Sequence, residues 1–95
     1  MPRGFLAAGA LLLALAAADA ALAEQSRKDV CDGDLRAEET RIRARALAEE
    51  KRMEAEAKRT GAAEEMPKLR AAIGRNLGFE LSQARQNHED CLKLP

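Results

Sequence analysis

The hydrophobic and polar positions divide the chain into an apolar leader and a longer amphipathic part. Every residue from Phe5 to Ala18 is small or apolar. Further along, hydrophobic residues recur three, four or seven positions apart, with charged side chains between them. This spacing keeps the hydrophobic residues on one narrow stripe of an α-helix. The pattern therefore predicts an all-α protein.

The first amphipathic segment is expected to form a helix over about residues 34–59. It contains neither Gly nor Pro from Asp34 to Arg59, and it is rich in Ala, Glu, Arg and Lys, which favour helix. Opposite charges stand three or four residues apart, as in Glu39 with Arg43, and stabilise the exposed surface of a helix. The apolar stripe of this segment consists of Cys31, Leu35, Ile42, Ala46, Met53 and Ala57.

A turn over about residues 60–66 is expected to lead into a second helix over about residues 67–92. Gly61 suits the end of a helix, and Pro67 suits the first turn of the next one, where its missing N–H removes no hydrogen bond. The two segments therefore predict an antiparallel helical hairpin. The second apolar stripe consists of Met66, Leu69, Ile73, Leu77, Ala84 and Cys91, with Glu80 and Asn87 at the intervening positions.

Gly74 and Gly78 leave the continuity of the second helix open, because each glycine costs a helix about 1 kcal/mol relative to alanine. Three interpretations follow from the sequence. The glycines allow the first helix to approach closely, they mark a break that produces a third short helix, or they are simply tolerated. Their spacing is not a membrane-helix motif, because Arg75 and Asn76 lie between them.

The leader has the features of a secretory signal peptide. Arg3 supplies a positive start to the apolar run, and Ala21 and Ala23 are the small residues that a signal peptidase requires. We expect cleavage between Ala23 and Glu24, which gives a signal peptide over residues 1–23 and one domain over residues 24–95. The apolar run is about 21 Å long as a helix, shorter than a membrane core of about 30 Å. No stable membrane insertion is expected after its removal.

The two cysteines, Cys31 and Cys91, are expected to form a disulfide, because exported proteins meet an oxidising compartment. Their midpoint is Gly61, so the bond would staple the open end of the hairpin. A loop of about 60 residues gives roughly 4 kcal/mol of stabilisation in the chain-entropy model. The same register places Met53 near Leu69, Ala46 near Leu77 and Ile42 near Leu81.

Composition excludes several functions once the leader is removed. The sixteen basic and sixteen acidic residues lose Arg3 and Asp19, which leaves fifteen of each. A neutral chain lacks the basic surface needed for nucleic acid. Phe79 is the only aromatic residue after the leader, and no nucleophile elbow or phosphate-binding glycine loop is present. We therefore expect no enzymatic activity, no cofactor and no nucleic-acid partner.

The residues with possible chemistry gather at the stapled end of the predicted hairpin. His88 and Cys91 are three residues apart and share a helix face, so with Cys31 they could bind zinc or copper(I) if both thiols were reduced. A disulfide removes both thiolates. A small exported metal-binding protein is therefore the alternative hypothesis, and no metal is assigned.

The favoured hypothesis is a non-enzymatic interaction or accessory protein of the periplasm or the secreted space. A single pair of helices cannot enclose all of its apolar residues, and exposed apolar surface favours partners. The expected partner is another exported protein or a second copy of the chain. Not all of the remaining large apolar residues fit the two stripes, namely Leu47, Phe79, Leu81, Leu92 and Leu94.

Overall fold

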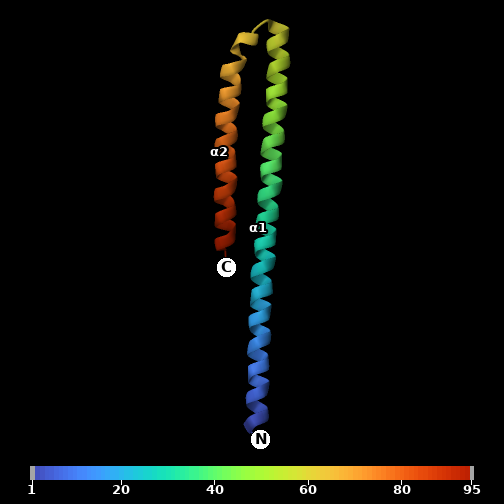
Figure 1. The fold of residues 1–95 in the computed structure, drawn as a ribbon, viewed down its shortest axis with the longest axis vertical. Coiled ribbons are helices and arrows are strands. Elements are labelled where there is room, and N and C mark those ends of the chain that lie inside the picture. The colour runs from blue at the N-terminus through green and yellow to red at the C-terminus, as the bar shows by residue number, and fades with distance from the viewer. Residues whose placement is uncertain (1, 95) are drawn as a thin grey trace.

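The chain forms two antiparallel helices joined by a tight turn. A computed structural model describes residues 2–94, with side chains described from residue 17 to residue 94. Helix α1 spans Pro2–Thr60, the short 3-10 helix η1 spans Ala63–Glu65, and helix α2 spans Met66–Lys93. The described chain is 91 Å long and 16 Å by 13 Å across. Figure 1 shows α2 lying beside the C-terminal half of α1, so that the N-terminal half of α1 extends alone. The all-α hairpin predicted from the sequence is confirmed.

Helix α1 begins far earlier than predicted. The start expected near Asp34 is wrong, because the helix is continuous from Pro2 through this region. Gly33 is the weakest helix former near the expected start, and one glycine does not end a helix that good helix formers continue on both sides. The amide of Gln25 also donates a hydrogen bond of 3.0 Å to Asp29, four residues later, which supports the helix just before this point.

The two predicted apolar stripes form the seam between the helices. Among the residues whose side chains are described, six are buried and all six were predicted: Cys31, Ile42 and Ala57 from α1 and Met66, Ile73 and Ala84 from α2. Their neighbours along the stripes, Leu35, Ala46, Met53, Leu69, Leu77 and Cys91, are half-buried. The prediction that Asn87 lies on the stripe is wrong. Asn87 is exposed, and His88 is half-buried in its place. His88 lies four residues after Ala84, so the stripe takes a four-residue step there.

The turn depends on Gly61. Its φ is +75°, in the left-handed region, where a residue with a Cβ atom is strained. The amide of Ala62 donates a hydrogen bond of 2.9 Å to the carbonyl oxygen of Ala57 and so closes the end of α1. This bond pattern is the Schellman motif of helix ends. Pro67 lies in the first turn of α2, as predicted.

The second helix is continuous. The break considered near Gly74 and Gly78 is absent, because α2 runs unbroken through both positions. Close approach of α1 is excluded as well: a Cβ atom added to either glycine would meet nothing within 4 Å. The remaining interpretation, that the glycines are tolerated, fits the structure. The flanking residues favour helix strongly enough, and the seam holds α2 on both sides of the glycines.

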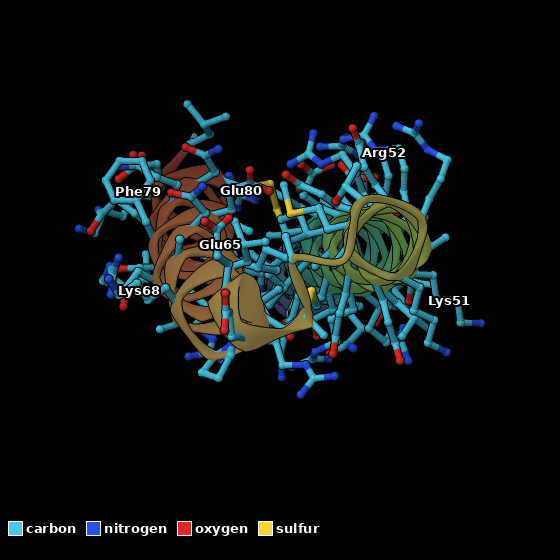
Figure 2. The ribbon with its side chains drawn as sticks, turned by 90° about the horizontal axis from the view of Figure 1, so that it is seen from above. Lys51, Arg52, Glu65, Lys68, Phe79 and Glu80 are labelled. Atoms are coloured by element: carbon cyan, nitrogen blue, oxygen red, sulfur yellow. A yellow bond between two sulfur atoms is a disulfide. The ribbon has the colours of Figure 1, made fainter. Side chains whose placement is uncertain are left out.

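Cross-helix ion pairs define two faces on either side of the seam. Arg45 of α1 pairs with Glu80 of α2, and Glu50 of α1 pairs with Arg70 of α2 at 3.3 Å. Arg45 and Glu50 are five residues apart, which separates them by about 140° around α1. We call the first side the Phe79 face, since Figure 2 shows Phe79, Glu80 and Arg52 on one side of the pair of helices. The opposite side, with Glu50 and Arg70, is the Leu47 face, because Leu47 lies one helical turn before Glu50.

Separate substitutions of Gly61 and Gly33 will test whether the turn requires glycine at position 61. Gly61→Ala should lower the free energy of unfolding by about 1–2 kcal/mol, because alanine resists the left-handed conformation. Gly33→Ala is the matched control, since Gly33 lies within α1 and has open space at its Cβ position. It should raise stability by about 0.5–1 kcal/mol. Urea unfolding followed by circular dichroism measures both effects, and equal changes of the same sign would contradict the assignment.

Candidate functional site

The stapled end of the hairpin contains the residues that the sequence analysis selected. Cys31 and Cys91 form a disulfide with a Cα–Cα distance of 5.9 Å, as predicted. Helix α1 positions Cys31 at the start of its buried stripe, and α2 positions Cys91 in its last turn. Cys31 is 1% exposed, whereas Cys91 is half-buried. The bond therefore covers the end of the seam with the two sulfur atoms.

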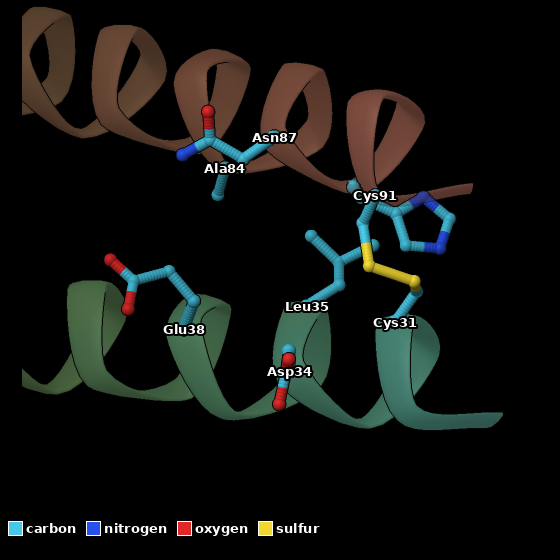
Figure 3. A pocket seen from close by; sticks show the side chains of 8 residues that line it. Cys31, Asp34, Leu35, Glu38, Ala84, Asn87 and Cys91 are labelled. Carbon is cyan, nitrogen blue, oxygen red and sulfur yellow. A yellow bond between two sulfur atoms is a disulfide. The ribbon is translucent and has the colours of Figure 1, made fainter. Parts of the chain in front are cut away.

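A hollow opens beside the disulfide on the side facing the seam. Figure 3 shows Leu35 projecting from α1 toward α2, with Glu38 and Asn87 further along the gap. Ala84 and the disulfide line the same hollow. Arg41 donates a side-chain hydrogen bond to Glu38 and lowers the pKa of this carboxyl. The rim of the hollow therefore carries the ionised carboxylate of Glu38 and the amide of Asn87, and its base is apolar.

His88 makes a second link between the helices at this end. Its Nε2 atom lies 2.7 Å from Oδ1 of Asp32. The hydrogen bond with His88 lowers the pKa of Asp32, since it stabilises the carboxylate more than the acid. Desolvation acts in the opposite direction, and the charges of His88, Lys28 and Arg36 add to the lowering.

The proposed metal-ligand set is not assembled in this oxidised structure. Both sulfur atoms of Cys31 and Cys91 are in the disulfide, and Nε2 of His88 faces Asp32. Among the residues that the structure describes, no three or more His, Cys, Asp or Glu side chains are grouped to hold a metal ion.

The predicted cleavage residues lie in the part of α1 that α2 does not reach. Ala23 and Glu24 are helical and exposed. The first described hydrogen bond across the hairpin comes later, where the guanidinium of Arg27 donates to the carbonyl oxygen of Leu94. The side chains of the apolar run as far as Ala16 lie outside the described residues. Within the described residues, no helix is both long enough and apolar enough to cross a membrane.

Sequence reasoning missed a shallow hollow on the Phe79 face. Arg45, Ala48, Glu49 and Arg52 of α1 line it. The signal was present, because Ala48 is a small residue between two arginines that lie three residues before it and four residues after it. The sequence did not show that this hollow would lie on the same side of the hairpin as the exposed Phe79 of α2.

The fold and the stapled end define a disulfide-bonded helical hairpin. Comparison of the chain with protein-family models, with curated proteins and with solved structures gives no match. Functional inference therefore rests on the residues of this chain.

Loss of the disulfide should destabilise the hairpin strongly. The bond closes a loop with a sequence separation of 60 residues. In the chain-entropy model this corresponds to about 4 kcal/mol of unfolding free energy. The double variant Cys31→Ala, Cys91→Ala should therefore unfold at a much lower urea concentration than the oxidised wild-type chain. Circular dichroism at 222 nm measures the midpoint, and identical midpoints would contradict a structural role for the bond.

The link between Asp32 and His88 predicts acid sensitivity. The folded-state pKa of Asp32 is below its unfolded value of about 3.8, so the carboxyl contributes stability above pH 4. That contribution is lost as the pH falls through the folded pKa. Asp32→Asn should therefore show a smaller loss of stability between pH 5 and pH 2, measured by urea unfolding at each pH.

Asp34→Asn is the control for this measurement, because Asp34 lies at the same end of α1 and makes no described hydrogen bond with His88. An acid response that Asp34→Asn changes as much as Asp32→Asn would refute the assignment.

Proposed function

We propose that the protein is an exported, non-enzymatic interaction protein of the periplasm or the secreted space, which binds another protein through the sides of its hairpin. The observation that carries this proposal is apolar surface that the hairpin leaves open. Phe79 is 65% exposed and Leu47 is 53% exposed, and they lie on opposite faces. A two-helix protein has no further layer to cover them, and exposed apolar side chains at fixed positions favour binding to other helices.

The placement of the leader supports export and processing. Residues 17–26 are exposed, and the first described hydrogen bond from α1 to the C-terminal end of the hairpin is made by Arg27. Cleavage after Ala23 would therefore remove a segment of α1 that extends beyond the end of α2 (Figure 1). The Cys31–Cys91 bond is compatible with an oxidising compartment. We propose that residues 24–95 form the functional protein after cleavage.

The alternative of a small exported metal-binding protein is not advanced. It needs Cys31 and Cys91 as thiolates together with His88, and no observation favours that reduced arrangement over the disulfide. The interaction hypothesis needs only the oxidised hairpin.

Site-specific photo-crosslinking in the cells that produce the protein tests the proposal. A benzophenone amino acid replaces Phe79 or Leu47 in separate experiments, and mass spectrometry identifies the adducts in the exported fraction. The expected result is a protein adduct from at least one face, on a chain that begins at Glu24. Lys51 is the control position, because it is exposed and Figure 2 shows it pointing away from α2.

Two results would contradict the proposal. Equal labelling from Lys51 and from both face positions would indicate random collision instead of a binding face. A protein retained in the cytoplasm with its leader intact would overturn export.

A further inference from the structure

The two halves of the Cys31–Cys91 disulfide differ in their access to solvent. Cys31 is 1% exposed, whereas Cys91 is half-buried. A hollow of about 230 Å³ lies beside the bond. Figure 3 shows the disulfide at one end of this hollow, between α1 and the last turn of α2. The surface that the disulfide offers to an approaching molecule therefore belongs almost entirely to Cys91.

The positions of the two cysteines along their helices increase this difference. Cys31 lies inside the continuous helix α1, with helical residues on both sides. Cys91 lies in the last turn of α2, which ends at Lys93. The last turn of a helix opens at a lower cost in free energy than its interior, because its carbonyl groups lack partners further along the helix. Local opening therefore gives more access to Cys91 than to Cys31.

Two polar contacts hold this last turn against α1. Before Cys91, Nε2 of His88 lies 2.7 Å from Oδ1 of Asp32. After Cys91, the guanidinium of Arg27 donates a hydrogen bond to the carbonyl oxygen of Leu94. The second contact is exposed, so water competes for both of its groups. The turn can therefore open from its C-terminal end while the link at His88 stays closed.

Thiol–disulfide exchange requires that a thiolate reach one of the two sulfur atoms. Attack on Sγ of Cys91 forms a bond between the external sulfur and Cys91 and breaks the Cys31–Cys91 bond. The electron pair of the broken bond leaves on Sγ of Cys31, which then takes a proton from water. The product is a mixed disulfide on Cys91 and a free thiol at Cys31.

The hairpin favours a partner with two thiols over a partner with one. After the first step the folded hairpin still holds Cys31 beside Cys91, at positions that are 5.9 Å apart between Cα atoms in the disulfide. The Cys31 thiolate therefore attacks the mixed disulfide again and expels a monothiol. A dithiol partner competes with this return, because its second thiolate attacks its own sulfur in the mixed disulfide and releases Cys91 as a thiolate. The hairpin then gains two electrons, and the partner becomes a disulfide.

We infer that Cys91 is the exchange site of this disulfide: an external dithiol protein reaches it through the last turn of α2 in the folded hairpin, and Cys31 is the leaving sulfur. In the reverse direction the oxidised partner forms its mixed disulfide with Cys91, and Cys31 closes the bond. This inference goes beyond the proposed interaction role and uses neither of the two outer faces.

Brief treatment of the folded, oxidised chain with 2-mercaptoethanol tests the choice of sulfur. This thiol has no charge besides its thiolate, so the carboxylates of Asp34 and Glu38 that line the hollow affect it least. Acid stops the exchange, and mass spectrometry of peptic peptides locates the mixed disulfide. We expect at least about tenfold more mixed disulfide at Cys91 than at Cys31.

The same treatment in urea that unfolds the chain is the control, and it should label the two cysteines in comparable amounts. Equal labelling of Cys31 and Cys91 in the folded chain would overturn the inference. So would a preference for Cys91 that persists unchanged in urea, because that preference would come from the local sequence and not from the fold.

The Arg27→Ala variant tests the route through the last turn of α2. Without the hydrogen bond to Leu94, reduction by dithiothreitol under native conditions should be at least about threefold faster than in the wild type. Arg43→Ala is the matched control, since it also removes one positive charge from α1 but pairs with Glu39, away from the bond. Its rate should equal that of the wild type. Equal rates for Arg27→Ala and Arg43→Ala would contradict the route.

A thioredoxin in which alanine replaces the second cysteine of the Cys-x-x-Cys pair tests the class of partner. It cannot complete the reduction, so it should remain bound to the oxidised hairpin through a disulfide to Cys91. A complex through Cys31, or no complex, would overturn the inference. Failure of the crosslinking at Phe79 and Leu47 would refute the interaction role and leave the exchange site unaffected.

Discussion

The disulfide between Cys31 and Cys91 is the constraint on which the rest of the structure depends. The seam between α1 and α2 is narrow: among the described residues six side chains are buried, and none of them is polar. So narrow a contact offers little hydrophobic stabilisation against the entropy of ordering two long helices. The covalent link lowers the conformational entropy of the unfolded chain, so that less entropy is lost on folding. A hairpin with a minimal core can then be stable. The fold therefore depends on an oxidising environment, because the disulfide requires one.

The sequence predicted the seam well, because a narrow seam is the simplest kind of core to predict. Each stripe position contacts only the opposite helix, so helical periodicity alone separates Ile42 and Ile73 from their charged neighbours. The cysteine pair then determined the direction and register of the arms. Met53 and Leu69, expected to be neighbours, do line one hollow near the turn. Gly61 was identifiable because few other residues adopt a positive φ at a helix end.

The errors arose where local signals were weak or balanced. The start of α1 was misplaced because Gly33 alone does not end a helix that good helix formers such as Glu24 and Lys28 continue on its N-terminal side. Gly74 and Gly78 allowed three interpretations. Only the structure could show that an added Cβ atom at either position meets no other atom within 4 Å. The hollow lined by Arg45, Ala48, Glu49 and Arg52 was missed for a different reason. It belongs to the outside of the molecule, where periodicity describes solvent exposure but not how neighbouring side chains on two helices are arranged.

The hairpin is fastened at both ends, and this has a mechanical consequence. The disulfide prevents one arm from moving along the other at the open end, and the Gly61 turn prevents it at the closed end. Sliding by one helical turn, a motion of about 5.4 Å available to many helix pairs, is blocked. The spacing between side chains on α1 and side chains on α2 is therefore constant along both faces. Such a rod presents its outer residues to a partner in one arrangement, without an entropic cost for selecting a register when it binds.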